Sequence, residues 1–423
     1  MTTLHTEELA ESTAARGFWT RSRKAGAIFV GLGLFAIGVF GSFAPADEVA
    51  RFTFSDDKVN LSIPIPAQLG AMGFGALCVL AGIGLLTRVA SRHLAWATVL
   101  GLFGFLMSFL SWQVAGGFMP MVAFIKGGVF LALPLVFGSL SGVLCERAGV
   151  INIGIEAQFL MGAFAGALIG TATGSLWLGL FGALVAGLAI ASLLAVFAIR
   201  YLVDQIVLGV ILVVLATGLT SFLYERLMQP HADTLNKPER FQNIPIPVLS
   251  EIPLIGPALF NSNMFLYLAV ILVAVVHLIL FYTRWGLRVR AVGEHPTAAD
   301  TVGVKVQRVR YLSVLAGGVV SGIGGAYFTL GQGHQFNKEM TDGAGYIALA
   351  AMIFGRYSPV GALGAAMLFG FASQLNVFLA GIDSEIPSEF LGMTPYIATI
   401  FAVAGLVGKV RPPAADGKPY VKG

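Results

Sequence analysis

The chain has 423 residues, of which 57% are hydrophobic and 11% are charged. Soluble domains carry about 25% charged residues, so this composition excludes an ordinary soluble globular protein. The formal net charge of +4 does not indicate nucleic-acid binding, because the basic residues sit in short loops beside apolar runs, where the positive-inside rule accounts for them.

Apolar runs of about 17–25 residues repeat along the chain, which is the length that an α-helix needs to cross a ~30 Å hydrocarbon core. We therefore predict an all-α fold, a polytopic transmembrane helical bundle of about 10–12 spans. The run at 344–355 is short for a full crossing, and the glycine-rich stretch near 149–160 predicts a broken or re-entrant segment. The runs cover 25–43, 67–86, 94–115, 121–143, 157–172, 176–199, 205–224, 263–283, 311–330, 344–355, 360–380 and 393–408.

The charges of the loops orient these spans. Residues 1–24 are polar and lack the features of a signal peptide, so we interpret them as a cytoplasmic N-terminal tail. Basic residues concentrate in 284–310 and in the C-terminal tail 409–423, whereas the loop at 44–64 is acidic. Because basic loops belong on the cytoplasmic side, both termini are expected inside, in a bacterial plasma (inner) membrane. The proline-rich segment 225–262 is then external and should form an irregular lid.

Motifs for catalysis and metal binding are missing from the sequence. Gly405-Leu-Val-Gly408-Lys409 approaches a P-loop, but it lacks the hydroxyl residue that holds Mg²⁺ and the strand that should precede it. The histidines are scattered, Cys78 and Cys145 form no CxxC, and no G-x-S-x-G elbow occurs. We therefore expect no catalytic residues, no bound metal and no ATPase motif of its own. A polytopic chain of this kind most often transports a solute.

The loop 284–310 predicts a short helix on the membrane surface. Pro296 suits the first position of a helix, and Gly303 is placed to end it. Basic residues flank this helix on both sides. An ordinary amphipathic connector between two spans would have the same composition, so composition alone does not decide between a connector and a docking element.

The same loop carries the first resemblance to a known family. The pattern Ala298-Ala299-x-x-x-Gly303 resembles the EAA loop of ABC importer permeases, whose short cytoplasmic helix docks into a groove on a separate ATPase subunit. The usual Glu of that signature is replaced by Thr297, with Glu294 three residues earlier. The Ile-x-Leu-Pro that normally follows is also missing.

Two further stretches are similar to ABC permeases that import nucleosides, branched-chain amino acids and ribose. Residues 139–158, which contain ERAGVINIGIEAQ, are similar to the ER-x-GVVNIG-x-EG segment of those permeases, and 343–364 is similar to their late motif. The form GE-x-P-x-AAD-x-x-G of the loop, followed by Arg310-Tyr311, most resembles the nucleoside-type, basic-membrane-lipoprotein-dependent branch. The resemblance covers about 122–408.

The resemblance implies an ABC permease core at 119–408, with 225–262 as its external loop and 284–310 as its cytoplasmic coupling loop, after extra N-terminal transmembrane helices at 25–118. It implies a permease subunit of an ATP-driven ABC importer that takes up nucleosides or related small hydroxylated solutes. The implied partners are ABC ATPase subunits, a second and different permease chain, and an extracytoplasmic solute-binding protein or lipoprotein. ATP then acts through the ATPase subunits, and this chain binds no cofactor itself. The implied ATPase-coupling residues are Glu294, Pro296, Ala298, Ala299 and Gly303.

Polar side chains near membrane depth are candidates for a translocation pathway. An ionised group at the centre of a membrane helix costs about 2.5–3.5 kcal/mol on insertion scales, so such groups usually face a cavity or a partner. Glu156 could equally pair with Arg147 and serve only the structure, and the later amides could bond a neighbouring helix. The candidates are Asn152, Glu156, Gln158, Gln374 and Asn376.

An ion-coupled secondary transporter is the alternative from another functional class, and ABC permeases for branched-chain amino acids or simple sugars are alternatives within the family. A secondary transporter needs carboxylates inside the membrane, and the apolar runs are almost free of them apart from Glu156. Glycines also recur every four residues from Gly162 to Gly174 and again at Gly318 and Gly322, which predicts helices that approach one another closely.

Overall fold

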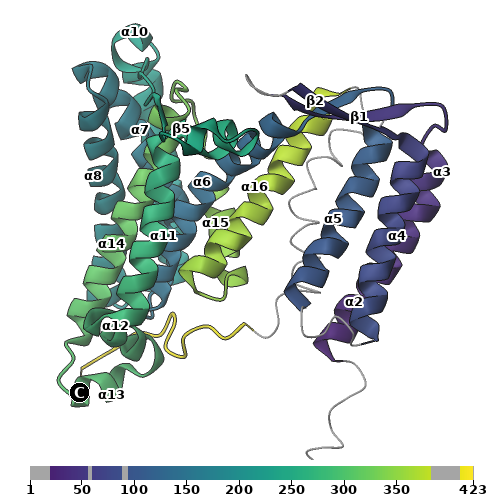
Figure 1. Ribbon diagram of the computed structural model, residues 1–423. Coiled ribbons are helices and arrows are strands. Elements are labelled where there is room, and N and C mark those ends of the chain that lie inside the picture. Colours follow the sequence, from purple (N-terminus) through teal and green to yellow (C-terminus); the bar gives the residue numbers. More distant parts are fainter. Residues whose placement is uncertain (1–19, 56–59, 88–93, 383–409, 423) are drawn as a thin grey trace, which may run out of the picture. The chain divides into compact units, whose positions relative to one another are not determined.

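A computed structural model describes residues 20–55, 60–87, 94–382 and 410–422. Within these residues, ten helices are long and apolar enough to cross a membrane, which confirms the predicted polytopic helical bundle (Figure 1). The expected span at 393–408 and most of the expected N-terminal tail lie outside the described residues. The candidate spans are Ser22–Phe43, Ala67–Leu86, Trp96–Gln113, Met121–Glu146, Ile155–Thr173, Leu176–Arg200, Gln205–Met228, Met264–Tyr282, Val306–Gly331 and Pro359–Gly381.

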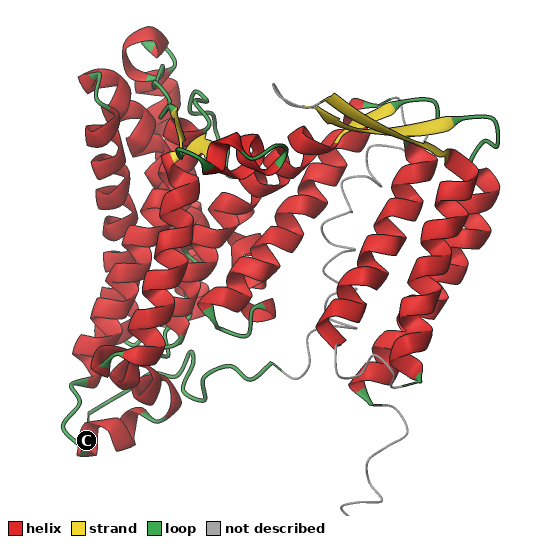
Figure 2. Ribbon diagram, in the orientation of Figure 1, coloured by secondary structure: helices red, strands yellow, loops and turns green. Residues whose placement is uncertain are grey.

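The chain divides into two compact units, Met1–Phe124 with Leu379–Gly408 and Ile125–Phe378 with Lys409–Gly423. Helices dominate both units, and the longer strands belong to the first (Figure 2). The elements of the first unit are α2 (Arg21–Phe35), η1 (Ala36–Phe40), α3 (Gly41–Phe43), β1 (Val49–Ser55), β2 (Asn60–Pro66), α4 (Ala67–Leu86), α5 (Leu94–Gln113) and β3 (Phe118–Pro120).

A three-stranded sheet and close helix packing organise the first unit. The strand order is β2-β1-β3, with β1 antiparallel to β2 and parallel to β3. The pairing of β1 with β3 aligns Phe52 with Met119, and both side chains are buried. Helices α2 and α4 approach closely, since a Cβ built on Gly26 would lie 2.7 Å from the carbonyl oxygen of Gly82. The sequence predicted only an acidic loop at 44–64, because the branched and aromatic residues that favour strands also fill membrane helices.

The second unit contains the remaining long helices and one half-length helix. Its long helices are α6 (Met121–Glu146), α7 (Ile155–Thr173), α8 (Leu176–Ala195), α9 (Gln205–Leu223), α11 (Met264–Tyr282), α14 (Val306–Ala326) and α16 (Pro359–Gly381). The π-helical turns η3 (Val196–Arg200), η4 (Tyr224–Met228) and η7 (Tyr327–Gly331) extend α8, α9 and α14. Helix α15 (Ala344–Phe354) has 11 residues, which is too few to cross a ~30 Å core at 1.5 Å per residue.

Helices α6 and α14 lie at the centre of the second unit. In their apolar stretches 89% and 83% of the residues are buried, against 28% for the stretches that contain α9 and α11. The packing of α14 depends on glycines, since a Cβ built on Gly187 of α8 would lie 2.4 Å from the carbonyl oxygen of Gly318. On the α7 side, a Cβ on Gly162 would lie 3.0 Å from the carbonyl oxygen of Gly322. The three helices touch main chain to main chain, and the glycine spacing predicted the close approach for α7 and α14.

The segment 225–262 is made of short elements joined by irregular chain, which agrees with the predicted absence of a folded domain there. Its main anchor is the buried side chain of Asn236, which accepts a hydrogen bond of 2.8 Å from the main-chain N–H of Phe336 and donates one of 2.9 Å to the carbonyl oxygen of the same residue. The short elements after η4 are α10 (Ala232–Leu235), β4 (Asn243–Pro245), η5 (Leu249–Glu251), η6 (Gly256–Phe260) and β5 (Asn261–Asn263), with β4 antiparallel to β5.

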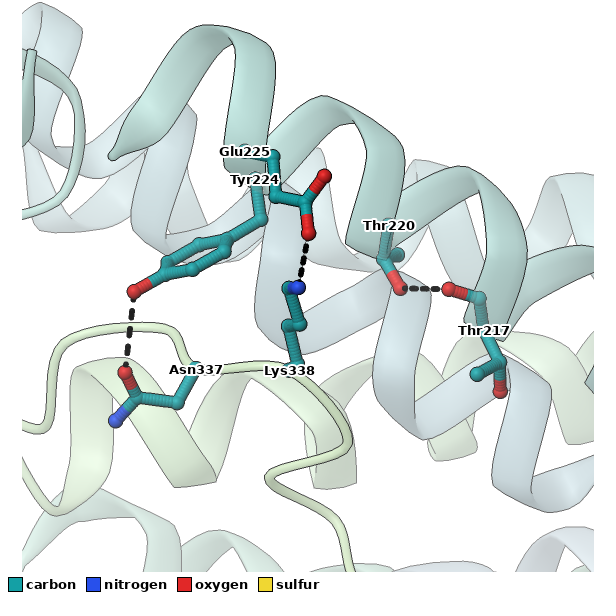
Figure 3. Close-up of polar contacts among 6 residues, drawn as sticks. All are labelled: Thr217, Thr220, Tyr224, Glu225, Asn337 and Lys338. Carbon is teal, nitrogen blue, oxygen red and sulfur yellow. Dashed lines mark hydrogen bonds and ion pairs between the residues drawn. The ribbon is translucent and has the colours of Figure 1, made fainter. Parts of the chain in front are cut away.

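Contacts from η4 also hold the loop that follows η7 (Figure 3). Glu225 and Lys338 form an ion pair, and the hydroxyl of Tyr224 donates a hydrogen bond of 3.5 Å to Oδ1 of Asn337. Both members of the ion pair are exposed, so the pair contributes only about 0–1 kcal/mol to stability. The loop 332–343 is therefore positioned mainly by its buried contacts.

Candidate functional site

The predicted surface helix is present at one end of the second unit, at the far end of α14 from η7 (Figure 1). Helix α13 (Pro296–Thr301) begins at Pro296, as the sequence predicts. Gly303 follows with a φ of 86°, a left-handed conformation that glycine adopts without strain. The side chain of Thr301 donates a hydrogen bond of 2.8 Å to the carbonyl oxygen of Ala298, which closes the last turn.

A second helix, α12 (Arg284–Glu294), precedes α13 and was not predicted. The hydroxyl of Thr283 caps it by accepting a hydrogen bond of 3.1 Å from the N–H of Gly286. A Cβ on Gly286 would lie 2.1 Å from the carbonyl oxygen of Ile279, so glycine permits the tight turn out of α11. Helix α12 buries Val289 and Val292 and exposes basic residues on its other face. The spacing of these two valines is the signal that would have revealed the helix.

The two faces of α13 differ in exposure. Ala299 points into the core of the unit and is 4% exposed, whereas Val302 directly after the helix is 78% exposed. Among the other predicted coupling residues, Glu294, Ala298 and Gly303 are exposed and Pro296 is half-buried. Ala299 therefore fixes the helix to the bundle, and the remaining residues form a surface that another protein can reach.

The C-terminal tail lies against this loop, a contact that the sequence did not reveal. The N–H of Ala415 donates a hydrogen bond of 2.8 Å to the carbonyl oxygen of Gly293, and the N–H of Ala414 donates one of 3.2 Å to Oε2 of Glu294. The buried guanidinium of Arg310 at the start of α14 donates one of 3.0 Å to the carbonyl oxygen of Lys418. The tail thus joins the end of α12 to the beginning of α14, on either side of α13.

The tail also carries a buried carboxyl group. Burial raises the pKa of Asp416 to about 6, while a hydrogen bond with Glu146 and the charge of Arg310 act in the opposite direction. Asp416 shares its surroundings with Tyr357, Pro413 and Lys418 in a cavity of about 480 Å³ at this end of the unit. Because this burial requires the C-terminal tail to lie against the bundle, protonation of Asp416 is linked to docking of the tail.

The segment 147–154 between α6 and α7 is an irregular joint. The predicted break near 149–160 is present, but the helix resumes at Ile155, so the second half of that range is regular helix. Gly149 has a φ of 83°, and a Cβ there would lie 2.9 Å from the carbonyl oxygen of Ala415 in the tail. The N–H of Ile151 donates a hydrogen bond of 2.7 Å to Oε1 of Gln205 on α9. The helix of this unit that is too short to span a membrane is α15, and not the segment near 149–160.

Glu156 in the first turn of α7 is bound to the start of α15. Its Oε1 accepts hydrogen bonds of 2.6 Å from the hydroxyl of Thr341 and 3.0 Å from the N–H of Gly343, and its Oε2 accepts one of 2.6 Å from the N–H of Gly345. The alternative pairing with Arg147 is wrong, because the Nε of Arg147 donates to the carbonyl oxygen of Tyr357 at 2.8 Å. The carboxylate acts as an N-terminal cap for a helix far away in the sequence.

The other predicted pathway residues fall into separate places. Asn152 and Gln158 are fully buried and joined to each other, with Nδ2 to Oε1 and Nε2 to Oδ1 both at 3.4 Å. Gln374 on α16 lies against Gly127 of α6, where a Cβ would meet its Oε1 at 2.2 Å. Asn376 is half-buried further along α16. Within the described residues no hydrogen bond joins the α16 amides to the Asn152 and Gln158 pair, so their shared role in a pathway stays a prediction.

Comparison with known proteins agrees with the geometry of the second unit. Residues 124–404 match the family described as the permease component of branched-chain amino acid transport systems. The guanosine ABC transporter permease protein NupQ of Bacillus subtilis (strain 168) is 40% identical over 69% of this chain and 94% of its own length. The nucleoside ABC transporter permease protein NupC of Lactococcus lactis subsp. cremoris (strain MG1363) is 39% identical over 68% and 93%.

A third relative carries a different substrate in its name. The putative glucose ABC transporter permease protein TsgC13 of Haloferax volcanii is 34% identical over 64% of this chain and 87% of its own length. No solved structure matches the chain significantly. The matched region begins at residue 124, so α2 to β3 lie before it.

Proposed function

This chain belongs to the family of permease components of branched-chain amino acid transport systems, and on that premise we propose that it is the permease subunit of an ATP-driven ABC importer for nucleosides. The chain has the helical bundle that such a subunit needs and lacks a complete Walker A motif. Hydrolysis of ATP therefore belongs to separate ATPase subunits, and this chain needs no cofactor or metal of its own.

The observation that carries this proposal is the exposed surface of α13 between α12 and α14. Val302 is 78% exposed there, although it is apolar and its neighbour Ala299 is anchored in the core. An ATPase subunit that docks on α13 would transmit its movement directly into α14, which is one of the two central helices. Energy then enters through the different affinities of the ATPase subunits for two states of the bundle.

For the solute we propose a nucleoside or a related small hydroxylated molecule. The relatives named for guanosine and nucleosides are 40% and 39% identical to this chain, and the relative named for glucose is 34% identical. A simple sugar is the second candidate on that basis. The remaining partners are an extracytoplasmic solute-binding protein or lipoprotein and a second, different permease chain.

Ion-coupled transport has less support than ATP-driven import. The carboxylate on which it would depend, that of Glu156, already accepts hydrogen bonds from Thr341, Gly343 and Gly345. These three donors give Glu156 a structural role at the start of α15.

The proposed orientation places α13 and the C-terminal tail in the cytoplasm of a bacterial cell, with the chain in the plasma membrane and both termini inside. The support is the concentration of basic residues in 284–310 and after residue 409. The loop 332–343 and the segment 225–262, at the other end of α14, then face outward. A tag placed after Gly423 should be reached by protease only in inverted vesicles.

The test is to purify the tagged chain from its native membrane, identify the co-purifying proteins, and measure uptake of labelled guanosine by the reconstituted complex. We expect an ATPase subunit and a second permease to co-purify with the chain. Uptake should require ATP on the side of the vesicle membrane that α13 faces. Recovery of this chain alone, with uptake driven by an ion gradient, would contradict the proposal. Uptake of glucose but not of guanosine would identify a simple sugar as the solute.

A further inference from the structure

A cavity of about 290 Å³ lies at the end of α14 opposite to α13. Ligand pockets in proteins typically measure about 300–1,000 Å³, so this cavity is close to the lower limit of that range and suits only a small solute. Its walls come from α6, from β4 and the chain before it, from β5, and from η7 with the loop after it. The residues that decide its chemistry are Lys126, Arg240, Phe241, Asn263, Tyr327 and His334.

Asn263 supplies a buried acceptor without a partner. The side chain is 3% exposed, and its Nδ2 donates a hydrogen bond of 2.9 Å to the carbonyl oxygen of Gly331, which sets the orientation of the amide. In the described part of the chain, Oδ1 of Asn263 has no hydrogen-bond partner. Buried polar atoms are nearly always satisfied, and an unsatisfied one calls for an explanation. A hydroxyl or N–H of a bound solute would satisfy it.

Two cations line the same cavity. Lys126 enters from α6, with its Nζ 5.9 Å from the ring centroid of Phe130, and Arg240 enters from the chain before β4. The stem of Arg240 rests on Gly333, where a Cβ would lie 2.9 Å from the Cβ of Arg240. No carboxylate lines the cavity among the described residues. The cations therefore present hydrogen-bond donors to a solute that carries oxygen or nitrogen acceptors.

Part of the remaining wall is aromatic and closely packed. Phe241 is 9% exposed and packs edge-on against Phe265 at 5.8 Å, which in turn packs against Tyr327 at 5.5 Å. The hydroxyl of Tyr327 donates a hydrogen bond of 2.9 Å to the carbonyl oxygen of Phe130. The N–H of Phe241 is held by the carbonyl oxygen of Leu330 at 2.9 Å. Such a wall suits one face or edge of a flat apolar ring.

We propose that this cavity is a nucleoside-binding site of the permease itself. A sugar hydroxyl donates to Oδ1 of Asn263, the ring carbonyl or nitrogen acceptors of the base meet Lys126 and Arg240, and the base packs beside Phe241. The site takes a small molecule that combines hydroxyl donors, ring acceptors and a flat apolar body. This inference rests on the proposed function and adds to it the place where the permease holds its solute.

The test uses photolabelling of the complete importer in nanodiscs with a radiolabelled azidoguanosine, followed by mapping of the labelled peptides. We expect label in the segments around 240–243 and 331–334, suppressed by excess guanosine. The variant Asn263→Leu should lower the labelling about tenfold, because it removes the unpaired acceptor. Arg240→Gln, an exposed position that does not depend on core packing, should lower it about fivefold. Lys237→Gln is the matched control, since Lys237 is exposed and lies outside the cavity.

The outcomes separate this inference from the proposed function. If the unmodified importer takes up guanosine but the label lies elsewhere, or Asn263→Leu and Arg240→Gln are labelled like Lys237→Gln, the cavity is not the site. If labelling is displaced by guanosine monophosphate and not by guanosine, the cations bind a phosphate and the nucleoside assignment is overturned. If the unmodified importer takes up no guanosine, the proposed function itself fails.

Discussion

The main-chain N–H of Gly345 donates a hydrogen bond of 2.6 Å to Oε2 of Glu156, across 189 residues of sequence. The other carboxylate oxygen accepts hydrogen bonds from Thr341 and Gly343. The first N–H groups of a helix have no partner within the helix, and the helix dipole favours negative charge at that end. Glu156 therefore holds the start of α15, a helix that cannot span the membrane alone.

Removal of this carboxylate should destabilise the second unit. Glu156→Ala leaves the buried donors without an acceptor, and we expect the free energy of unfolding to fall by about 1–3 kcal/mol. Glu156→Gln keeps one acceptor oxygen and should lose less. Thermal unfolding of the purified protein in detergent measures both. If both variants were as stable as the unmodified protein, and if their uptake no longer depended on an ion gradient, Glu156 would be an ion-coupling carboxylate and not a helix cap.

The exposed apolar residue after α13 should matter for coupling and not for folding. Val302→Glu places a charge on the proposed docking surface, and we expect ATP-dependent uptake to fall at least tenfold, which corresponds to about 1.4 kcal/mol. Val302 is 78% exposed, so expression and thermal unfolding should not change. Val248→Glu, at a position that is 76% exposed and remote from α13 in the fold, is the matched control. Equal uptake by the two variants would mean that α13 is only a connector.

Docking of the C-terminal tail should strengthen as the pH falls. The pKa of Asp416 is raised to about 6 by burial, above the value of about 3.9 in an unfolded chain. The folded state therefore binds the proton more tightly, and the stability that Asp416 contributes is complete below about pH 4 and is lost as the pH rises through about 6. Asp416→Asn should remove this dependence. Protease protection of the tail between pH 4 and 7 measures the effect, and a flat profile for the unmodified chain would contradict it.

The glycine contact between α8 and α14 should not tolerate a larger side chain. A Cβ on Gly187 would lie 2.4 Å from the carbonyl oxygen of Gly318, a main-chain atom that has no room to move. Overpacking of a core costs about 1–3 kcal/mol or more, so we expect Gly187→Leu to lower the unfolding temperature and the yield. A Cβ on Gly218 of α9 meets nothing within 4 Å, and Gly218→Leu should be tolerated. Equal behaviour of the two variants would show that α8 and α14 do not pack as described.

Several features of the fold could be predicted from local sequence because their causes are local. The spans follow from the number of consecutive apolar residues, and α13 follows from Pro296 and Gly303, whose backbone preferences act at their own positions. The close approach of α7 and α14 to neighbouring helices was readable because a glycine every four residues leaves one face of a helix without side chains. The role of 284–310 needed a resemblance as well, since a connector has the same composition.

Other features depended on partners that are distant in the sequence. Glu156 was recognised as a polar group needing a partner, but its partners lie more than 180 residues further along the chain. The tail binds Gly293 and Glu294 through its main-chain N–H groups, which every non-proline residue possesses. The sequence did not mark Asn263 as a candidate binding residue, because the cavity that it lines is formed by four segments that are separate in the sequence.

The sequence by itself determined that this chain is a polytopic helical protein, where most of its spans begin and end, and which short loop resembles a coupling helix. These properties arise from apolar length and from the backbone preferences of proline and glycine, which act within a few residues. Only the tertiary structure decided which donor meets which acceptor: that Glu156 caps α15, that the tail joins α12 to α14, and that Asn263, whose Oδ1 has no partner among the described residues, lies in the wall of a basic, partly aromatic cavity. Hydrogen bonds are short-ranged and directional, so their partners are defined only after packing has brought distant segments together.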